Sequence, residues 1–319
     1  MKFTKVDDYF KDVNSIGISG HVKPDGDCIG STLAMYNYIT ENYPDIKVDI
    51  FLEPIPSVFK FLKNSDKINS EYDIDASYDL FIALDCGDIG RLGKAGKYLK
   101  GAKNSICIDH HISNVKFADN SFVYPNISSA SEVLFEMLDT AHISTAVAEC
   151  IYTGIVHDTG VFRYSSTTKR TMEIAGFLME KGIKFTDIIG KTFYEKTYEQ
   201  NRILGCALVK SRRYLDDKVI ASVLNIEEMR DYKVSPRHLE GIVSQLNSTR
   251  GVEVAIFIYQ NEGGTYKVSL RSVSYVDVAA IAQKYGGGGH KRAAGVTMNP
   301  GQDANEILEI ILDEIKNQI

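Results

Sequence analysis

Short apolar segments bounded by glycine, proline or charged residues recur through the first half of the chain. The four clearest segments are 15–21, 47–52, 80–85 and 105–109, and helix-like stretches alternate with at least some of them. Segments of this length and composition are typical of strands. Their alternation with helices predicts an α/β fold with a mostly parallel sheet and helices on both faces.

The second half of the chain has a different pattern, in which strand-like segments come before a helix, a glycine run and a closing helix. In chain order, these elements lie at residues 218–224, 252–258, 266–271, 276–284, 286–289 and 304–316. An amphipathic helical stretch at about 170–200 separates the two patterns. We therefore expect a second, smaller α/β domain after this stretch.

Composition narrows the class of protein. The 319 residues are 44% hydrophobic and 24% charged, which is ordinary for a soluble globular chain. No stretch reaches the roughly 18 apolar residues of a membrane span, and the N-terminus lacks the apolar core of a signal peptide. We expect a cytoplasmic protein that does not bind membranes.

Charge and cysteine content limit the partners further. A net charge of −6 argues against binding of long nucleic acid, although a local basic patch can still hold a short anionic substrate. The five widely spaced cysteines favour buried thiols over disulfides or a zinc site. Any metal site must therefore use aspartate and histidine.

Acidic residues and histidines gather where the predicted apolar elements end. Three clusters, 21–27, 83–88 and 108–111, follow strands, and a fourth, 156–160, follows a helical stretch. Ligands bind beyond the carboxyl ends of parallel strands, so we expect these clusters to share one rim of the sheet. Two metal ions ~3.5–4 Å apart need a shared carboxylate and several further ligands, and these residue types supply them. Mixed carboxylate and imidazole ligands favour Mn²⁺ over Mg²⁺ or Ca²⁺.

Each cluster by itself also has an ordinary structural explanation. The Pro-Asp-Gly-Asp segment at 24–27 has the composition of a polar turn. Asp85 has the position of a helix cap, and Asp158 that of a turn residue. All of these explanations would have to hold at once on one rim. The combination therefore predicts a two-metal hydrolase site.

The same motifs resemble those of DHH-family phosphoesterases with a C-terminal DHHA1 domain. The matching segments are HVKPDGDCIGS (21–31), LDCGD (84–88), DHH (109–111), DTGVFRYSST (158–167) and GGGGHKRAAG (286–295). The resemblance covers nearly the whole chain and is greatest to the nanoRNase type, the bifunctional oligoribonucleases and phosphatases of 3′-phosphoadenosine 5′-phosphate (pAp). It implies a DHH catalytic domain at 1–190, a helical linker at 191–205 and a DHHA1 substrate-binding domain at 206–319.

The resemblance also implies a role for each residue of the metal site. One Mn²⁺ would be held by His21, Asp25 and Asp85, and the other by Asp27, Asp85, His110 and Asp158. Asp85 would thus bridge the two ions, for which Co²⁺ and Mg²⁺ are the alternatives. His111 would face the scissile phosphate as a catalytic residue together with Asp85, and Asp109 would orient a histidine. Cys28 replaces a common alanine of the family; it is either a small packed residue or a thiol that would make the metal site sensitive to oxidation.

The glycine run of the second domain lets backbone N–H groups approach a phosphate closely, although flexible linkers have a similar composition. The resemblance implies that Gly288, Gly289 and His290 contact a substrate phosphate and that Arg271 is a second anchor. Two stretches of the first domain stay open at this stage. Residues 129–132 fit a helix capping box. Residues 162–164 fit either a base- or phosphate-binding segment or an edge strand.

The expected activity is metal-dependent hydrolysis of short oligoribonucleotides to mononucleotides, with removal of the 3′-phosphate of pAp. A fixed separation between phosphate anchor and metals would favour substrates of a few nucleotides. The alternative within the same chemistry is a phosphodiesterase for the signalling dinucleotides pApA, pGpG or cyclic di-AMP. A non-catalytic nucleotide sensor is disfavoured because every expected ligand is present. Family members often dimerise, so the resemblance leaves a homodimer possible, but the sequence names no interface for one.

Overall fold

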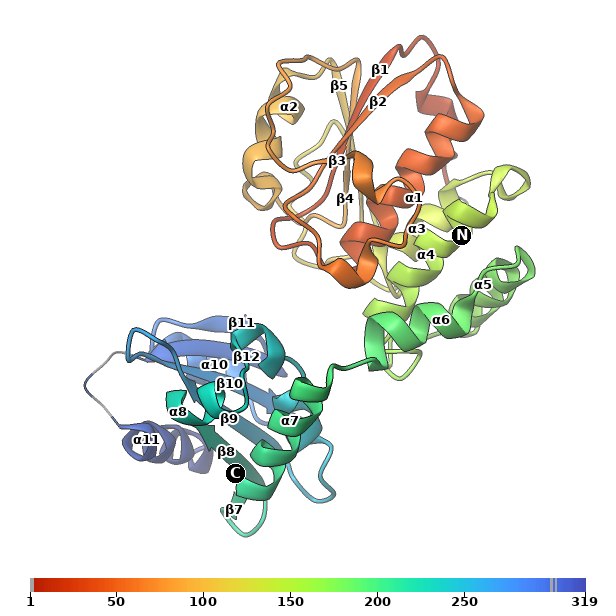
Figure 1. Cartoon of the computed structure of the whole chain (residues 1–319). Helices are drawn as coiled ribbons and strands as arrows, with labels where there is room; N and C mark the ends of the chain where they lie inside the picture. Colours follow the sequence, from red (N-terminus) through yellow and green to blue (C-terminus); the bar gives the residue numbers. More distant parts are fainter. Residues whose placement is uncertain (1–2, 299–300, 302) are drawn as a thin grey trace. The chain divides into compact units, whose positions relative to one another are not determined.

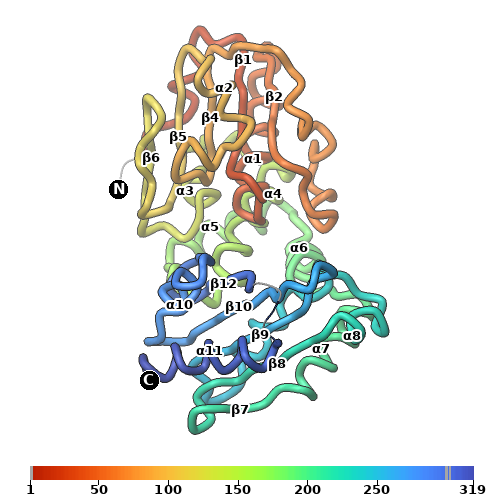
Figure 2. Tube along the Cα trace, turned by 90° about the vertical axis from the view of Figure 1, so that its left-hand side faces the viewer, coloured from red at the N-terminus to blue at the C-terminus, as the bar shows by residue number. Residues whose placement is uncertain are grey.

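The chain divides into two compact units, Met1–Glu195 and Lys196–Ile319, in the computed structural model shown in Figures 1 and 2. The structure describes residues 3–298, 301 and 303–319. The division falls within the range 191–205 that the sequence predicts as a linker, and the exact domain limits stay predictions. None of the described helices combines the length and the apolarity that crossing a lipid bilayer requires.

The first unit is built on a sheet of six parallel strands among its described residues, in the order β3-β2-β1-β4-β5-β6. The strands are β1 Ser15–Ser19, β2 Lys47–Phe51, β3 Ile68–Asn69, β4 Leu80–Leu84, β5 Asn104–Asp109 and β6 Asn120–Val123. The four apolar segments of the sequence form β1, β2, β4 and β5, which confirms the predicted parallel sheet. Strands β3 and β6 were not predicted, because one has two residues and the other is only partly buried.

Helices cover both faces of this sheet, as the sequence predicts (Figure 1). Their bounds are α1 Gly26–Asn42, α2 Gly96–Gly101, α3 Ala130–Met137, α4 Thr145–Asp158, α5 Lys169–Glu180 and α6 Phe185–Ile189. Successive side chains of a strand face opposite layers. Ile82 of β4 therefore packs in the core that α1, α3 and α4 complete. Its neighbours Phe81 and Ala83 pack in the core on the α2 side.

Glycines let α1 and α4 approach each other closely. A Cβ atom on Gly30 of α1 would lie 2.5 Å from the carbonyl oxygen of Cys150 in α4, and one on Gly154 would lie 2.6 Å from Oδ1 of Asp27. Real Cβ atoms do not approach other atoms so closely, so both positions require glycine. The close approach brings the end of α4, where Asp158 lies, beside the first turn of α1.

The second unit contains a mixed sheet with the order β11-β12-β10-β9-β8-β7 over its described residues. The strands are β7 Arg212–Tyr214, β8 Val219–Leu224, β9 Val254–Gln260, β10 Tyr266–Ser272, β11 Gly288–His290 and β12 Ala293–Met298. The pair β8 and β9 is parallel, and the other described pairs are antiparallel. The helices are α7 Tyr198–Lys210, α8 Ile226–Asp231, α9 Ile242–Asn247, α10 Val278–Lys284 and α11 Ala304–Lys316.

Helices again lie on both faces of this sheet. Helices α10 and α11 complete one apolar core, and α7, α8 and α9 complete the other. The sequence predicts β8, β9, β10, α10 and α11 but not β7, β12, α8 or α9. The predicted second α/β domain is confirmed.

Candidate metal centre

The candidate site lies at the carboxyl ends of three neighbouring strands of the first unit. Strand β1 pairs with β4, and β4 pairs with β5, so the residues that follow these strands meet at one edge of the sheet. Helices α1 and α4 add carboxylates from their ends. The structure thereby brings together the eight residues that the sequence assigns to this site: His21, Asp25, Asp27, Asp85, Asp109, His110, His111 and Asp158.

Asp85 lies at the centre of the group. Its side chain is only 2% exposed, and its Oδ1 atom accepts no hydrogen bond within the described part of the chain. Burial raises the pKa of Asp85 even though His21 stabilises the carboxylate. The residue has a φ angle of +53°, which is uncommon for a non-glycine residue. The imidazoles of His110 and His111 lie 3.7 and 3.5 Å from Oδ1 without forming a hydrogen bond to it, and a bound cation would stabilise this buried oxygen further.

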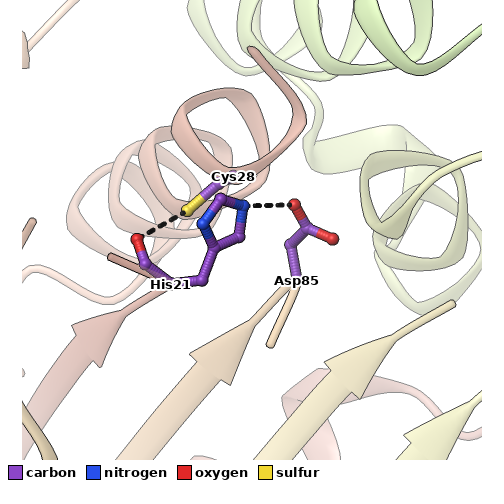
Figure 3. A group of neighbouring side chains, drawn as sticks. All are labelled: His21, Cys28 and Asp85. Atoms are coloured by element: carbon purple, nitrogen blue, oxygen red, sulfur yellow. Dashed lines mark hydrogen bonds and ion pairs between the residues drawn. The ribbon is translucent and has the colours of Figure 1, made fainter. Parts of the chain in front are cut away.

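His21 faces Asp85 from the end of β1, as Figure 3 shows. Its Nε2 atom lies 3.4 Å from Oδ2 of Asp85 and 3.6 Å from Oδ2 of Asp25. Its Nδ1 atom lies 2.9 Å from the carbonyl oxygen of Val22, a contact that keeps Nε2 facing the two carboxylates. Burial alone lowers the pKa of His21, but Asp25 and Asp85 outweigh burial and raise it to about 10.

A second group lies on the other side of Asp85. Nε2 of His110 is 3.0 Å from Oδ2 of Asp158 and 3.7 Å from Oδ1 of Asp85. Burial lowers the pKa of His110, but Asp158 and Asp27 outweigh it and raise the pKa to about 10. The pKa of Asp27 is also raised, by burial first and then by the charges of Asp85 and Asp158. The carboxylates repel one another, and a bound cation would neutralise this repulsion.

The N-terminus of α3 holds the carboxylate of Asp27, a role that the sequence does not reveal. The backbone N–H of Ala130 donates to Oδ2 of Asp27 at 2.6 Å, and that of Ser131 donates to Oδ1 at 3.0 Å. Ser129 caps this helix as predicted, because its Oγ accepts from the N–H of Glu132. The predicted capping box is wrong in its second half, since the Glu132 carboxylate accepts from Ser128 and Thr171 instead.

His111 is oriented by a buried carboxylate. Its Nδ1 atom lies 2.7 Å from Oδ1 of Asp109, and Nδ2 of Asn114 donates to the other oxygen of Asp109 at 2.6 Å. The bond to Asp109 raises the pKa of His111. Burial works against the ionisation of Asp109, but His111 and Asn114 outweigh it and lower the pKa of Asp109. His111 therefore favours the protonated form and has a fixed ring orientation. The sequence carried no signal for Asn114.

Cys28 lies beside His21 and Asp85, as Figure 3 shows. Its thiol is fully buried and lies 3.8 Å from the carbonyl oxygen of His21. Burial and then the charges of Asp85 and Asp25 raise the pKa of the Cys28 thiol well above its usual value. The thiolate is therefore disfavoured, and the oxidation sensitivity expected from the sequence stays a prediction.

The donor set as a whole fits divalent cations. Carboxylates and imidazoles are the ligands of Mn²⁺, Co²⁺ and related ions, and the unpartnered Oδ1 of Asp85 lies between the two groups. Ligand atoms that all lie within 4.8 Å of one another form three sets among the described residues: His21, Cys28 and Asp85; Asp85, His110 and His111; and Asp27, His110 and Asp158. Asp85 belongs to two of these sets, as a residue between two ions would.

The four substrate residues expected from the sequence lie in the second unit. The glycine run is not a loop throughout, because Gly288, Gly289 and His290 form the edge strand β11. His290 lies opposite Ala293 in β12, and Ala293 lies opposite Arg271 in β10. Directly opposite residues point to the same face of a sheet, so Arg271 and His290 share a face, about 10 Å apart across two strand spacings.

The glycines of this strand differ in what they require. A Cβ atom on Gly289, which has a φ of +147°, would collide with the backbone of β12. A Cβ atom on Gly288 would meet no atom within 4 Å. Gly289 is therefore needed for strand packing, whereas the space where a side chain of Gly288 would start is open.

Comparison with known proteins agrees with this geometry. Residues 15–155 match the model of the DHH family, N-terminal domain, and residues 216–317 match that of the DHHA1 domain. A curated relative from Streptococcus mutans, named probable bifunctional oligoribonuclease and PAP phosphatase NrnA, is 31% identical over 89% of this chain and 90% of its own. The chain belongs to the DHH family. As a member, it is a phosphoesterase of a metal-dependent family, and the clusters above are its candidate metal ligands.

Two further similarities extend over almost the whole chain. The Bacillus subtilis bifunctional oligoribonuclease and PAP phosphatase NrnA is 28% identical over 92% of this chain and 93% of its own. The crystal structure of an exopolyphosphatase-related protein from Bacteroides fragilis matches with a TM-score of 0.88 at 27% identity, over 98% of this chain and 94% of that one.

Proposed function

We propose that this DHH-family phosphoesterase hydrolyses short oligoribonucleotides to mononucleotides and removes the 3′-phosphate of pAp, with two Mn²⁺ ions as cofactors. The observation that carries the proposal is the buried Oδ1 of Asp85, which accepts no hydrogen bond from the described residues and lies between two groups of carboxylates and imidazoles. The names of the Bacillus subtilis and Streptococcus mutans relatives include both activities and support this choice of substrates.

In this proposal each ion has its own ligands and shares Asp85. His21, Asp25 and Asp85 hold one ion, and Asp27, Asp85, His110 and Asp158 hold the other. When bound, the two ions polarise the scissile phosphate and lower the pKa of a water molecule that attacks it. Co²⁺ and Mg²⁺ are the alternative metals, and the imidazole ligands favour Mn²⁺ over Mg²⁺.

His111 acts on the phosphate itself. Its Nδ1–H is held by Asp109, which leaves Nε2–H of the protonated ring as a donor. From this position His111 stabilises negative charge on the phosphate and gives a proton to the leaving oxygen. Asn114 keeps the Asp109 carboxylate in place by its own hydrogen bond.

The second unit supplies phosphate contacts. Arg271 and His290 lie on the same face of the sheet, and the backbone of Gly288 and Gly289 lies at the sheet edge. We assign these residues to a terminal phosphate of the substrate, because cationic side chains and backbone N–H groups at a strand edge both bind phosphate. A terminal anchor selects substrates of a few nucleotides over long nucleic acid.

The test is a parallel assay of the metal-stripped protein supplied with Mn²⁺, Co²⁺ or Mg²⁺. The substrates are pAp, pApA, pGpG, cyclic di-AMP and 5′-labelled RNA of two to twenty nucleotides, with Asp85→Asn as the inactive control. We expect Mn²⁺-dependent turnover of pAp and of the shortest RNAs. Equal turnover of a dimer and a twenty-mer would contradict the length limit. Preference for cyclic di-AMP would indicate a phosphodiesterase for signalling dinucleotides. No turnover of any substrate would indicate a non-catalytic nucleotide sensor.

A further inference from the structure

The turn that follows Asp158 has a strained backbone. Gly160, Val161 and Phe162 have consecutive φ angles of +54°, +57° and +62°. Such angles are rare for non-glycine residues and are outliers for a β-branched residue such as Val161. Backbone strain of this kind persists only where surrounding contacts enforce it, and it is concentrated at functional sites.

Hydrogen bonds to Thr159 enforce the turn. The backbone N–H of Phe162 donates to Oγ1 of Thr159 at 3.0 Å, and those of Arg163 and Tyr164 donate to its carbonyl oxygen at 2.8 and 2.9 Å. The ring of Phe162 packs against the buried ring of Tyr152, with centroids 6.2 Å apart. Residues 162–164 are thus part of a held turn, and the edge-strand alternative of the sequence analysis is wrong.

The turn presents the ring of Tyr164 on the surface. In the sequence, Tyr164 follows the candidate metal ligand Asp158 by only six residues. A Cβ atom on Gly160 would lie 2.5 Å from Cζ of Tyr164, so the ring lies directly on this glycine. Tyr164 is nevertheless 57% exposed, which leaves the other side of its ring open to solvent. Gly160 follows Asp158 by two residues, so the anchored ring lies near this metal ligand.

Arg163, the residue before Tyr164 in the chain, adds positive charge to this turn. It is exposed and forms no ion pair within the described ranges, in contrast to nearby Arg170, which binds Glu136 at 2.6 Å. An anchored aromatic ring next to an uncompensated cation is a common surface for single-stranded nucleotides, because the ring stacks on a base and the cation attracts phosphate.

We propose that Tyr164 forms a nucleobase-binding subsite in the first unit, on which a base of the substrate stacks. This inference rests on the proposed nucleotide substrate and adds how the first unit recognises it. The base contact is independent of base identity, because every base has an aromatic face. Tyr164 is therefore a binding residue whose loss weakens base-containing ligands and spares the phosphate chemistry.

The test compares AMP with ribose 5-phosphate, which has the same phosphate and sugar but lacks the base. Binding of each ligand to the full chain with Mn²⁺ is measured by calorimetry for the wild type, Tyr164→Leu and Tyr164→Phe. We expect the wild type to bind AMP more tightly than ribose 5-phosphate. Tyr164→Leu should weaken the binding of AMP about 5- to 150-fold, the usual range for one stacked base. The affinity for ribose 5-phosphate should stay unchanged. Tyr164→Phe keeps the ring and should bind like the wild type.

Unchanged AMP affinity in Tyr164→Leu, equal weakening of both ligands, or wild-type affinities that do not differ between the two ligands would each overturn the subsite. Turnover of pApA by the wild type is measured in parallel. Normal turnover with no effect of Tyr164→Leu rejects the subsite alone. No turnover of any short nucleotide, with base-dependent AMP binding intact, rejects the proposed hydrolysis and keeps the subsite.

Discussion

Each unit buries a carboxylate next to a central strand, and the two carboxylates have opposite surroundings. Asp85 follows β4 in the first unit and is 2% exposed, and Glu253 precedes β9 in the second unit and is 5% exposed. Oδ1 of Asp85 accepts no hydrogen bond from any described residue. Glu253 accepts bonds from the backbone N–H groups of Ser274, Tyr275 and Val276 and from the Ser274 hydroxyl.

The pKa values follow this difference. Burial raises the pKa of Asp85. Burial also opposes ionisation of Glu253, but its bonds to Ser274, Val276 and Tyr275 outweigh burial and lower its pKa. Burial of a carboxylate therefore does not mark a metal site. Asp85 differs from Glu253 in having an oxygen that the protein leaves without a hydrogen-bond donor, and such an oxygen gains most from a cation.

The largest expected effect comes from Asp85→Asn. The amide has nearly the same shape and tolerates the positive φ, but it is a poor ligand between two cations. We expect kcat/KM to fall about 1,000-fold or more, equivalent to about 4 kcal/mol of lost transition-state stabilisation. Without metal, the same variant should be more stable than the wild type, since a costly buried charge is removed. A less stable metal-free variant in urea unfolding would contradict our account of Asp85.

The second prediction concerns Asp27. Its hydrogen bonding is intermediate between that of Asp85 and that of Glu253, because two backbone N–H groups of α3 donate to its carboxylate. Ala130→Pro removes the N–H that donates to Oδ2 of Asp27, and proline suits this first helical position. The preceding Ser129 already has the extended backbone that proline requires. Loss of a contact that orients a metal ligand should lower metal affinity or activity about 10- to 100-fold.

The control for proline at a first helical position is Lys169→Pro in α5, where the preceding Thr168 is also extended and the replaced residue, unlike buried Ala130, is exposed. This variant should keep wild-type metal affinity, measured by titration with Mn²⁺. Equal affinities for both proline variants would mean that α3 does not orient Asp27.

The third prediction makes the same kind of change at Glu253 and expects the opposite effect on stability. Glu253→Gln keeps Oε1, which accepts from the N–H groups of Ser274, Tyr275 and Val276, but it removes the negative charge that strengthens these bonds and replaces Oε2, the acceptor of the Ser274 hydroxyl, by NH₂. We expect a loss of about 2 kcal/mol in the free energy of unfolding. Catalytic constants of the folded fraction should stay unchanged. If the variant were as stable as the wild type in urea titration, the hydrogen bonds of Glu253 would not stabilise the fold, and Glu253 would not differ from Asp85 in this respect.

The smallest effect is the pH dependence of that stability. The pKa of Glu253 is lower in the folded protein than its usual 4.5, so the unfolded chain binds the proton more readily. The contribution of Glu253 is therefore complete above the unfolded pKa and is lost as pH falls through the folded pKa. The stability difference between wild type and Glu253→Gln should be constant above about pH 5.5 and shrink below it. A difference that grows on acidification would show the opposite pKa shift.

The sequence was most informative where local pattern and chemistry coincide. Strand β4 and the carboxylate after it were predictable, because an apolar run that ends in aspartate specifies both the strand and the rim position. Helix α11 has the predicted bounds, since its apolar residues recur with helical period. Short elements were missed: α8 and α9 have six residues each, which is too few for a clear period.

The sequence by itself determined the α/β class, the two units, and the residue types and strand ends of the metal site. Only the tertiary structure decided which polar groups meet across long separations, such as Asp27 with α3 or Asp109 with Asn114. It also decided that Glu253 is saturated by a loop and that one oxygen of Asp85 is not. The reason is physical. The local pattern specifies the position of a side chain on its strand or helix, whereas its burial and hydrogen bonds depend on distant segments that fold against that element.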